Sequence, residues 1–247
     1  MPIRIIEDSF KYCIKNKLFF CLIVLLLFIN NYIIITTKSL LAVIISLIFV
    51  IGYGLQVTQD IINGGTELPK LMPKKMVIFG IKGIIVFLFY FTIQGIFLAI
   101  VAAFLHFPEL EIEELILRYN ETINLFWSHD PLSFVMFIVF EFIIIYSTSF
   151  FMELSIAKLA DGGNIKNTLN FLKIKRAIDV IGWKDYSWDY TKIILSVVIL
   201  TYLTQYHISI TIVDSIFSTI LRLLIFIIQF MGMGYVYKVY KENELES

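Results

Sequence analysis

The chain has 247 residues, of which 59% are hydrophobic and only 16% are charged. Soluble domains are nearer half apolar and a quarter charged, so this composition excludes an ordinary soluble protein and favours a membrane protein. The net charge is zero, which gives no indication of nucleic-acid binding. The two cysteines, Cys13 and Cys21, have no metal-binding or disulfide spacing.

A helix needs about 20 mostly apolar residues to cross the hydrocarbon core of a bilayer, and the chain has six apolar runs near that length. In chain order they are residues 18–35, 40–55, 77–105, 132–157, 193–206 and 215–237. The runs do not alternate apolar and polar residues as barrel strands do. The sequence therefore predicts an all-α fold, a polytopic transmembrane helix bundle of about six spans.

Lysine and arginine are distributed unevenly between the connections. All but three of the 20 basic residues lie in or beside residues 1–17, the second and fourth connections, and the tail, residues 238–247. The exceptions are Lys38, Arg118 and Arg222. Because cytoplasmic loops are enriched in Lys and Arg, this pattern predicts a cell-membrane protein with both termini in the cytoplasm.

The acidic connection 107–131 is expected on the outer side, with a short helix on the membrane surface. Asn120 begins an Asn-Glu-Thr sequon there and is a candidate glycosylation site. His106, His129 and His207 fall near the same face without the spacing of a zinc site; their convergence in space on the acidic connection is the alternative left open. No nucleophile, phosphate-loop or dinucleotide motif occurs. We therefore expect no enzyme, metal or cofactor.

Two cytoplasmic segments have the pattern of helices that lie in the headgroup region, with a partner-binding helix as the alternative. Residues 1–17 combine isoleucines and Phe10 with several lysines. In residues 164–190, Ile165, Leu169 and Leu172 are expected on one helical face, away from the basic residues. An aromatic belt at the membrane surface is expected from the residues that follow. These are Trp183, Tyr186, Trp188 and Tyr190.

The connection between the second and third spans begins with the stretch GYGLQVTQDIINGGTELPKL, residues 52–71. The first two glycines permit close helix contact. Asn-Gly-Gly at 63–65 predicts the end of a helix, and Leu-Pro at 68–69 predicts an extended step. A similar Asp-Gly-Gly at 161–163 follows the fourth span, which suggests an internal repeat of two-helix units.

This stretch, together with FGIKGIIVFLFY at residues 79–90, resembles the archaeal membrane family catalogued as Domain of Unknown Function 4013, over about residues 52–237. The matching positions are Gly52, Tyr53, Asn63, Gly64, Leu68, Pro69, Gly80 and Lys82. The resemblance implies a multi-pass membrane protein of uncharacterised function and supplies no catalytic residue. The chain departs from the family at residues 70–75, which are rich in lysine where family members usually have acidic and aromatic residues.

Two ionisable side chains, Glu141 and Arg222, lie inside predicted spans at similar depth. An ionisable group in a span is costly unless it has a partner, so we expect these two to pair inside the bundle. Four polar residues are candidates to line a pathway near them. These are Asn30, Gln94, Ser218 and Gln229. The open alternatives are a pair that only fixes helix register, a solute or proton pathway, and an Arg222 side chain that reaches outward to Asp214.

The first functional hypothesis is a membrane scaffold or an accessory subunit that binds a protein partner at its cytoplasmic face. The alternative is a small-solute transporter or channel-like protein that uses Glu141 and Arg222. A lipid-modifying enzyme is the weakest hypothesis, because no carboxylate or histidine cluster can be assembled at an interface. A polar cavity that reaches Glu141 would favour transport, and a sealed bundle packed on small residues would favour a scaffold.

Overall fold

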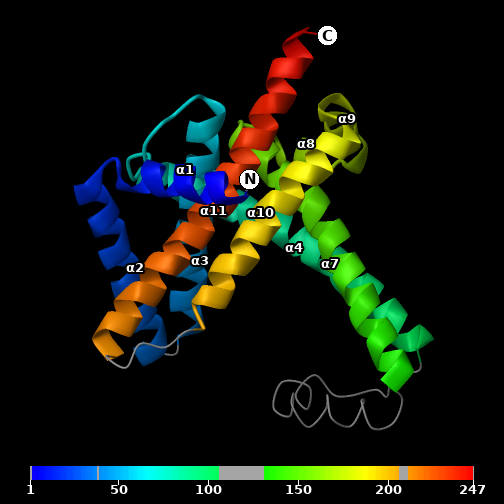
Figure 1. Ribbon diagram of the computed structural model, residues 1–247, viewed down its shortest axis with the longest axis horizontal. Helices are drawn as coiled ribbons and strands as arrows, with labels where there is room; N and C mark the ends of the chain where they lie inside the picture. The colour runs from blue at the N-terminus through cyan, green and yellow to red at the C-terminus, as the bar shows by residue number, and fades with distance from the viewer. Residues whose placement is uncertain (1, 38, 106–130, 206–210, 247) are drawn as a thin grey trace. The chain divides into compact units, whose positions relative to one another are not determined.

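The computed structural model describes residues 2–37, 39–105, 131–205 and 211–246, and only the backbone of residues 2–5, 30–37, 211–213 and 246. Every regular element within the described residues is a helix, which confirms the predicted all-α class. The helices are α1 (Pro2–Ile14), α2 (Lys17–Thr37), α3 (Leu40–Ile62), α4 (Pro73–Phe104), α7 (Pro131–Ala160), α8 (Ile165–Thr168), α9 (Phe171–Ile181), α10 (Trp183–Leu203) and α11 (Thr211–Glu246) (Figure 1).

The chain divides into two compact units. Unit 1 consists of Met1–Val86 and Glu153–Ser247, and unit 2 consists of Phe87–Met152. Unit 1 therefore holds α1 to α3, the first part of α4, the last turns of α7, and α8 to α11. Unit 2 holds the remainder of α4 and α7, which are apolar along their length.

Four helical segments are long and apolar enough to cross a membrane: Leu40–Ile62, Pro73–Phe104, Pro131–Ala160 and Asp214–Leu245. The described parts of α1 and α2 form a pair bent by 100°, which counts as a fifth if it is one span. The described residues thus contain four or five helices that could span a membrane, so the predicted number of six is approximate. The expected fifth span, residues 193–206, falls largely in α10, which is not one of the four because its first half carries lysines and aspartates.

Helix α3 packs closely against two neighbours through the glycines of its Gly-x-Gly sequence. A Cβ atom at Gly52 would lie 1.9 Å from the carbonyl oxygen of Met76 in α4. A Cβ atom at Gly54 would lie 2.5 Å from the ring of Phe230 in α11. Residues i and i+2 point about 200° apart around a helix, so the two glycines open nearly opposite sides of α3. The predicted close contact at these glycines is confirmed.

Helix α11 also packs closely against two neighbours through a Gly-x-Gly sequence, Gly232 and Gly234. A Cβ atom at Gly232 would lie 2.6 Å from the side chain of Ile193 in α10, and one at Gly234 would lie 2.9 Å from the side chain of Ile61 in α3. Thr58 adds a polar link, because its hydroxyl donates a 2.8 Å hydrogen bond to the backbone carbonyl of Phe230. Helices α3 and α11 are therefore the centre of unit 1, with α10 and α4 on their outer sides.

Helices α3 and α7 end in the same way. Gly64 has φ of 83° and Gly162 has φ of 91°, a conformation that glycine adopts without strain. In both helices this glycine donates its N–H to the carbonyl three residues earlier, and the next glycine donates to the carbonyl five residues earlier. This is the Schellman motif, so the helix stops expected at residues 63–65 and 161–163 are confirmed. The internal repeat stays a hypothesis.

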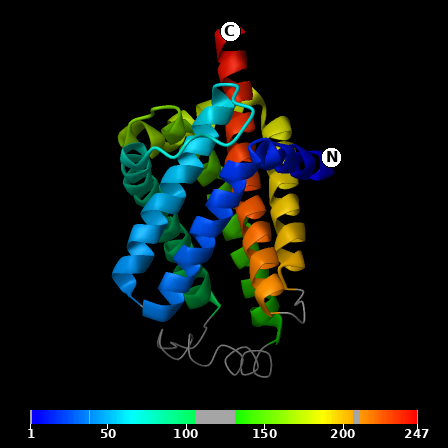
Figure 2. The same cartoon turned by 90° about the vertical axis from the view of Figure 1, so that its left-hand side faces the viewer.

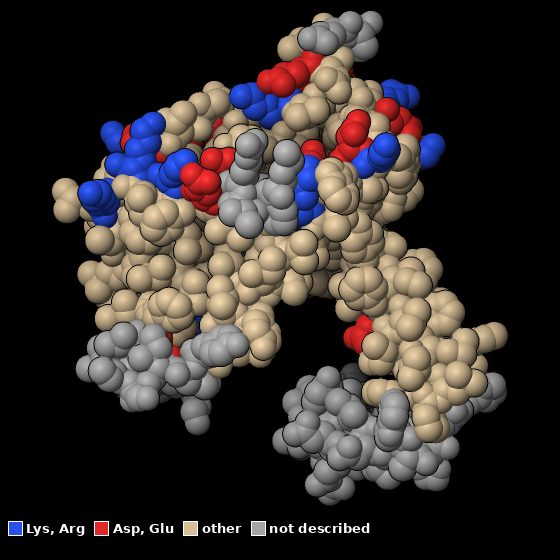
Figure 3. Space-filling view, in the orientation of Figure 1, with Lys and Arg blue, Asp and Glu red and all other residues tan. Residues whose placement is uncertain are grey.

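One end of unit 1, which we call the charged end, is formed by α1, α8, α9 and the C-terminal part of α11 (Figures 1 and 2). Charged side chains gather over this end, and uncharged side chains cover the helices below it (Figure 3). Residues 238–247, expected as a separate tail, instead continue α11 as far as Glu246. Lys241 holds this extension with an ion pair of 2.8 Å to Asp161, beside the cap of α7.

The expected face of Ile165, Leu169 and Leu172 does not lie on one continuous helix, and Leu172 is 75% exposed. The helix is interrupted before this residue, because the Asn170 side chain accepts a hydrogen bond from the Lys173 backbone N–H and starts α9 in a new phase. The buried face of α9 is formed by Ile174, Ala177, Ile178 and Ile181.

Two of the four residues expected in the aromatic belt are buried instead, and a belt formed by the other two stays a prediction. Trp183 and Trp188 are exposed, as a belt requires. Tyr186 and Tyr190 are 2% and 1% exposed, one helical turn apart on the buried face of α10. The two tryptophans therefore lie on the exposed side of α10, and the two tyrosines lie on its buried side and belong to the core.

Candidate functional site

The residues of the family motif form the corner between α3 and α4. A Cβ atom at Gly80 would lie 1.9 Å from the carbonyl oxygen of Ile48, so the two helices touch backbone to backbone there. Tyr53 donates a 3.3 Å hydrogen bond to the carbonyl of Pro69, and Leu68 is buried. Asn63 and Gly64 end α3, while Lys82 is half-buried on α4. These positions hold a turn in place and bring no reactive groups together.

The buried Gln56 belongs to the same corner. Its side-chain N–H donates to the carbonyl of Met72 at 3.2 Å, which ties α3 to the residues that enter α4. The side-chain oxygen of Gln56 has no hydrogen-bond partner among the described residues. A single side-chain amide with one unused acceptor does not make a binding site. Gln56 therefore stabilises the corner between α3 and α4.

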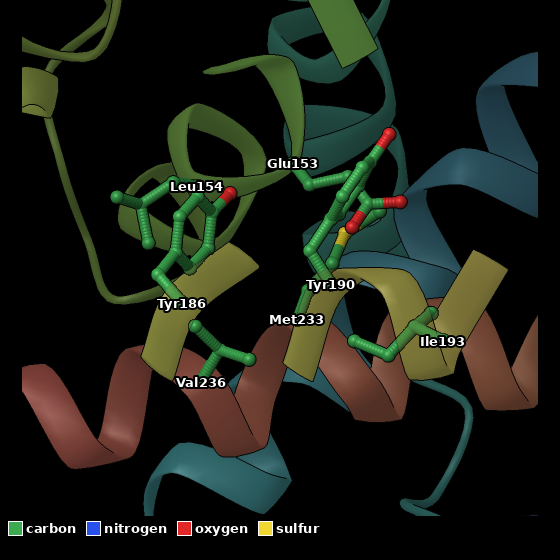
Figure 4. A pocket seen from close by; sticks show the side chains of 7 residues that line it. All are labelled: Glu153, Leu154, Tyr186, Tyr190, Ile193, Met233 and Val236. Carbon is green, nitrogen blue, oxygen red and sulfur yellow. The ribbon is translucent and has the colours of Figure 1, made fainter. Parts of the chain in front are cut away.

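A buried carboxyl group lies on the other side of α11. Glu153 on α7 is 4% exposed, and Gln229 on α11 is its hydrogen-bonding partner. Figure 4 shows its side chain beside the ring of Tyr190 and near Met233, with Tyr186 lying farther along the same space, next to Leu154. The space between these side chains has no room for a water molecule. No lysine or arginine is among the residues that line it.

This arrangement pairs a carboxyl group with an amide inside a dry, aromatic core. A buried polar group is costly unless it is hydrogen-bonded, and Gln229 meets that requirement. Because the space has no room for water and its described lining includes no second carboxyl group, lysine or arginine, it shows no route for a proton. Glu153 was not among the residues predicted from the sequence. The criterion that selected Glu141, an ionisable side chain inside the predicted span 132–157, also applies to Glu153.

Arg222 lies in a different place, beside a cavity of about 800 Å³ in unit 1. We call this cavity the α2–α3–α11 groove, after the helices that supply most of its walls; the beginning of α4 closes one end. Its lining is mostly apolar and includes Ser46 and Thr219 as polar neighbours of Arg222. Arg222 is exposed and makes no ion pair with a described residue of unit 1, Asp214 included. The outward contact with Asp214 is therefore absent.

The predicted pathway residues do not form one group. Glu141 and Gln94 belong to unit 2, whereas Arg222, Ser218 and Gln229 belong to unit 1. The Glu141–Arg222 pair therefore stays a prediction. Within unit 1, Gln229 bonds with Glu153, and the Ser218 hydroxyl donates to the backbone carbonyl of Asp214. The backbone of Asn30 lies in α2, and its side chain lies outside the description.

Several sequence-based predictions fall outside the described residues. They concern Asn120, His106, His129 and His207. Within the described part of the chain, no group of three His, Cys, Asp or Glu residues is arranged to hold a metal ion.

The fold thus defines an all-helical membrane protein with glycine-packed helices and no assembled catalytic group in its described part. Residues 35–213 match the family described as Protein of unknown function (DUF4013). This match covers more than half of the chain, so the protein belongs to that family, as its motif residues indicated. No curated protein and no solved structure matches the chain.

Proposed function

We propose that the protein is a membrane scaffold or accessory subunit, without enzymatic activity, that binds a protein partner at its charged end. The observation that carries this proposal is the close packing of α3 on α4 and of α11 on α3 and α10 within unit 1. Glycines bring α3 and α4 into backbone contact and let α11 pack closely on α3 and α10, and the space beside the buried Glu153 has no room for a water molecule. Such packing suits a rigid support better than a passage for solutes.

The surface of α9 supports the location of the partner. Phe171 and Leu172 are exposed beside Lys173 and Arg176, although the helix has a separate buried face. Two large apolar side chains framed by cations suit a partner with an acidic rim and an apolar centre. We further infer that the charged end faces the cytoplasm, because lysine and arginine are enriched on that side of membranes.

A photo-crosslinking amino acid at Leu172 tests the partner in native membranes. Leu195, an exposed leucine on α10 within the apolar region, is the matched control position. The proposal expects a discrete protein adduct from position 172 and none from position 195. Adducts of lipid alone at position 172, or the same protein adduct at both positions, would contradict it.

Labelling tests the orientation. In a chain with both cysteines replaced by serine, a membrane-impermeant maleimide is expected to react with Lys175→Cys in inverted vesicles and not in intact cells. Leu40→Cys, at the opposite end of α3, is expected to show the reverse. Labelling of Lys175→Cys from outside intact cells would overturn the orientation.

The alternative is a small-solute transporter or channel-like protein that uses Glu141 and Arg222, and the open groove beside Arg222 is the observation in its favour. Purified protein in liposomes that contain a pH-sensitive dye separates the two functions. The scaffold proposal expects proton flux equal to that of empty liposomes. Flux that exceeds this level and is lost in Glu141→Gln would favour the transporter.

A further inference from the structure

The α2–α3–α11 groove has the length of one leaflet of a bilayer. The α3 residues that line it are at positions 42, 45, 46, 49, 50 and 53, which form one continuous face of the helix. This face rises about 16 Å at 1.5 Å per residue. Half of the hydrocarbon core of a bilayer is about 15 Å thick. A single extended chain therefore fits along the groove.

The register of α3 and α11 fixes where the polar groups of the groove lie. The two helices run in the same direction, because Thr58 bonds with Phe230 and, further along both helices, Ile61 meets Gly234. Arg222 lies about two turns before Phe230 on α11. Ser46 lies about two turns before Gly54, the α3 residue that faces Phe230.

Arg222, Thr219 and Ser46 therefore lie at one level of the groove, in the half of unit 1 farther from the charged end. From that level toward the charged end, the lining is apolar, with Val50, Phe226, Met76 and Ile23 among its residues. Tyr53 also lies in this part, with its hydroxyl already bonded to the backbone of Pro69. Ser46 is four residues from Ala42, so the cationic level lies about 6 Å inside the groove, and an apolar channel of about 10 Å extends from it toward the charged end.

The cationic level has no negative partner among the described residues of unit 1. The described residues that line the groove include no aspartate or glutamate, and Arg222 has no described carboxylate of this unit within ion-pair distance. An arginine in the membrane is costly unless it meets an anion. A guanidinium group binds phosphate with two parallel hydrogen bonds, and the long side chain can reach toward the headgroup region.

We propose that the α2–α3–α11 groove binds one anionic membrane phospholipid, with its phosphate at Arg222 and an acyl chain in the apolar channel. The cavity of about 800 Å³ has the size of established ligand pockets. The cationic level lies farther from the charged end than the apolar channel does. This is the order of headgroup and acyl chain in a lipid of the leaflet opposite the charged end. This inference goes beyond the scaffold proposal and does not depend on it.

Native mass spectrometry tests the site. The full-length protein is reconstituted with equal amounts of phosphatidylglycerol and phosphatidylcholine, extracted in mild detergent, and analysed for bound lipid. The wild type is expected to retain one phosphatidylglycerol and to prefer it at least tenfold over phosphatidylcholine. Arg222→Gln is expected to lose this preference. Lys184→Gln, which removes an exposed cation of α10 outside the groove, is expected to keep it.

A second variant separates loss of the site from loss of the fold. Val50→Trp fills the apolar channel and keeps Arg222, so it is expected to lower lipid retention at least tenfold while thermal unfolding still shows a folded protein. Three outcomes would overturn the inference: equal retention of both lipids by the wild type, unchanged preference in Arg222→Gln, or full retention in folded Val50→Trp. Glu141→Gln is expected to leave retention unchanged, and a loss there equal to that of Arg222→Gln would also overturn it.

Discussion

The hydroxyl of Tyr12 on α1 donates a 2.8 Å hydrogen bond to the carboxylate of Asp60 in the last turn of α3. Tyr12 is 4% exposed, and the carboxylate packs on Gly65, where a Cβ atom would lie 1.7 Å away. Burial, followed by the hydrogen bond with Asp60, raises the pKa of Tyr12 far above its ordinary value. The hydroxyl therefore stays a donor at all physiological pH values, and this bond fastens α1 across the charged end.

Tyr12→Phe removes only that hydroxyl. A hydrogen bond to a charged group contributes about 1.5–3 kcal/mol, so we expect a loss of this size in the free energy of unfolding. We also expect faster trypsin cleavage at Lys15 and Lys17, because α1 is released. Tyr235→Phe, on an exposed tyrosine of α11, is the matched control and should change neither measurement. Wild-type unfolding and cleavage in Tyr12→Phe would show that α1 is held by other contacts.

Alanine at Gly52 or Gly80 is expected to disturb the corner between α3 and α4. At both positions the added Cβ atom would lie 1.9 Å from a backbone oxygen of the facing helix, and that backbone cannot rotate away. Overpacking of this kind costs about 1–3 kcal/mol, which thermal unfolding in detergent measures. Gly95→Ala is the control, because a Cβ atom there meets nothing within 4 Å. Equal stability of all three variants would contradict the close contact.

Cys13 is expected to resist alkylation in the folded protein. The residue is fully buried, and burial raises the pKa of its thiol to about 12, so the reactive thiolate is scarce at neutral pH. In a Cys21→Ser chain, maleimide labelling should stay low between pH 7 and pH 9 and become complete in denaturant. An ordinary thiol, with a pKa near 8.5, would become much more reactive across this range. Such a rise for Cys13 would place it at the surface.

Two substitutions distinguish a structural from a proton-carrying Glu153. Glu153→Ala removes the partner of Gln229 and leaves a void, so we expect a loss of about 2–4 kcal/mol in the free energy of unfolding. Glu153→Gln keeps the volume and the hydrogen bond, and should remain within about 1 kcal/mol of the wild type. Glu67→Ala, on an exposed glutamate, controls for charge. A folded Glu153→Gln protein that abolishes a measured proton flux would argue for a functional carboxyl group.

The local features of the fold were predictable because their causes are local. Asn63-Gly64-Gly65 ends α3, since only glycine takes the left-handed conformation easily, and Gly52 admits a neighbouring backbone because it has no side chain. Apolar length predicts membrane helices for the same reason. Each of these inferences needs only a few adjacent residues.

The burial of particular faces was harder to predict. The phase of α9 depends on the cap at Asn170, and a shift of one or two residues exchanges Leu172 with Ile174 as the inward residue. Tyr186 and Tyr190 are typical of a membrane surface by type, but α7 and α11 pack on them and make them core. The groove beside Arg222 requires three helices from distant parts of the chain, and no sequence spacing encodes it.

The partnership of α3 with α11 also determines when unit 1 can be completed. Thr58 and Phe230 are 172 residues apart, so the side of α3 that contains Gly54 has no permanent neighbour until nearly the whole chain has left the ribosome. Until then α4 can pack on the Gly52 side of α3, but the Gly54 side stays open to lipid, to chaperones or to other nascent chains. Arrival of α11 is then the event that makes the protein mature.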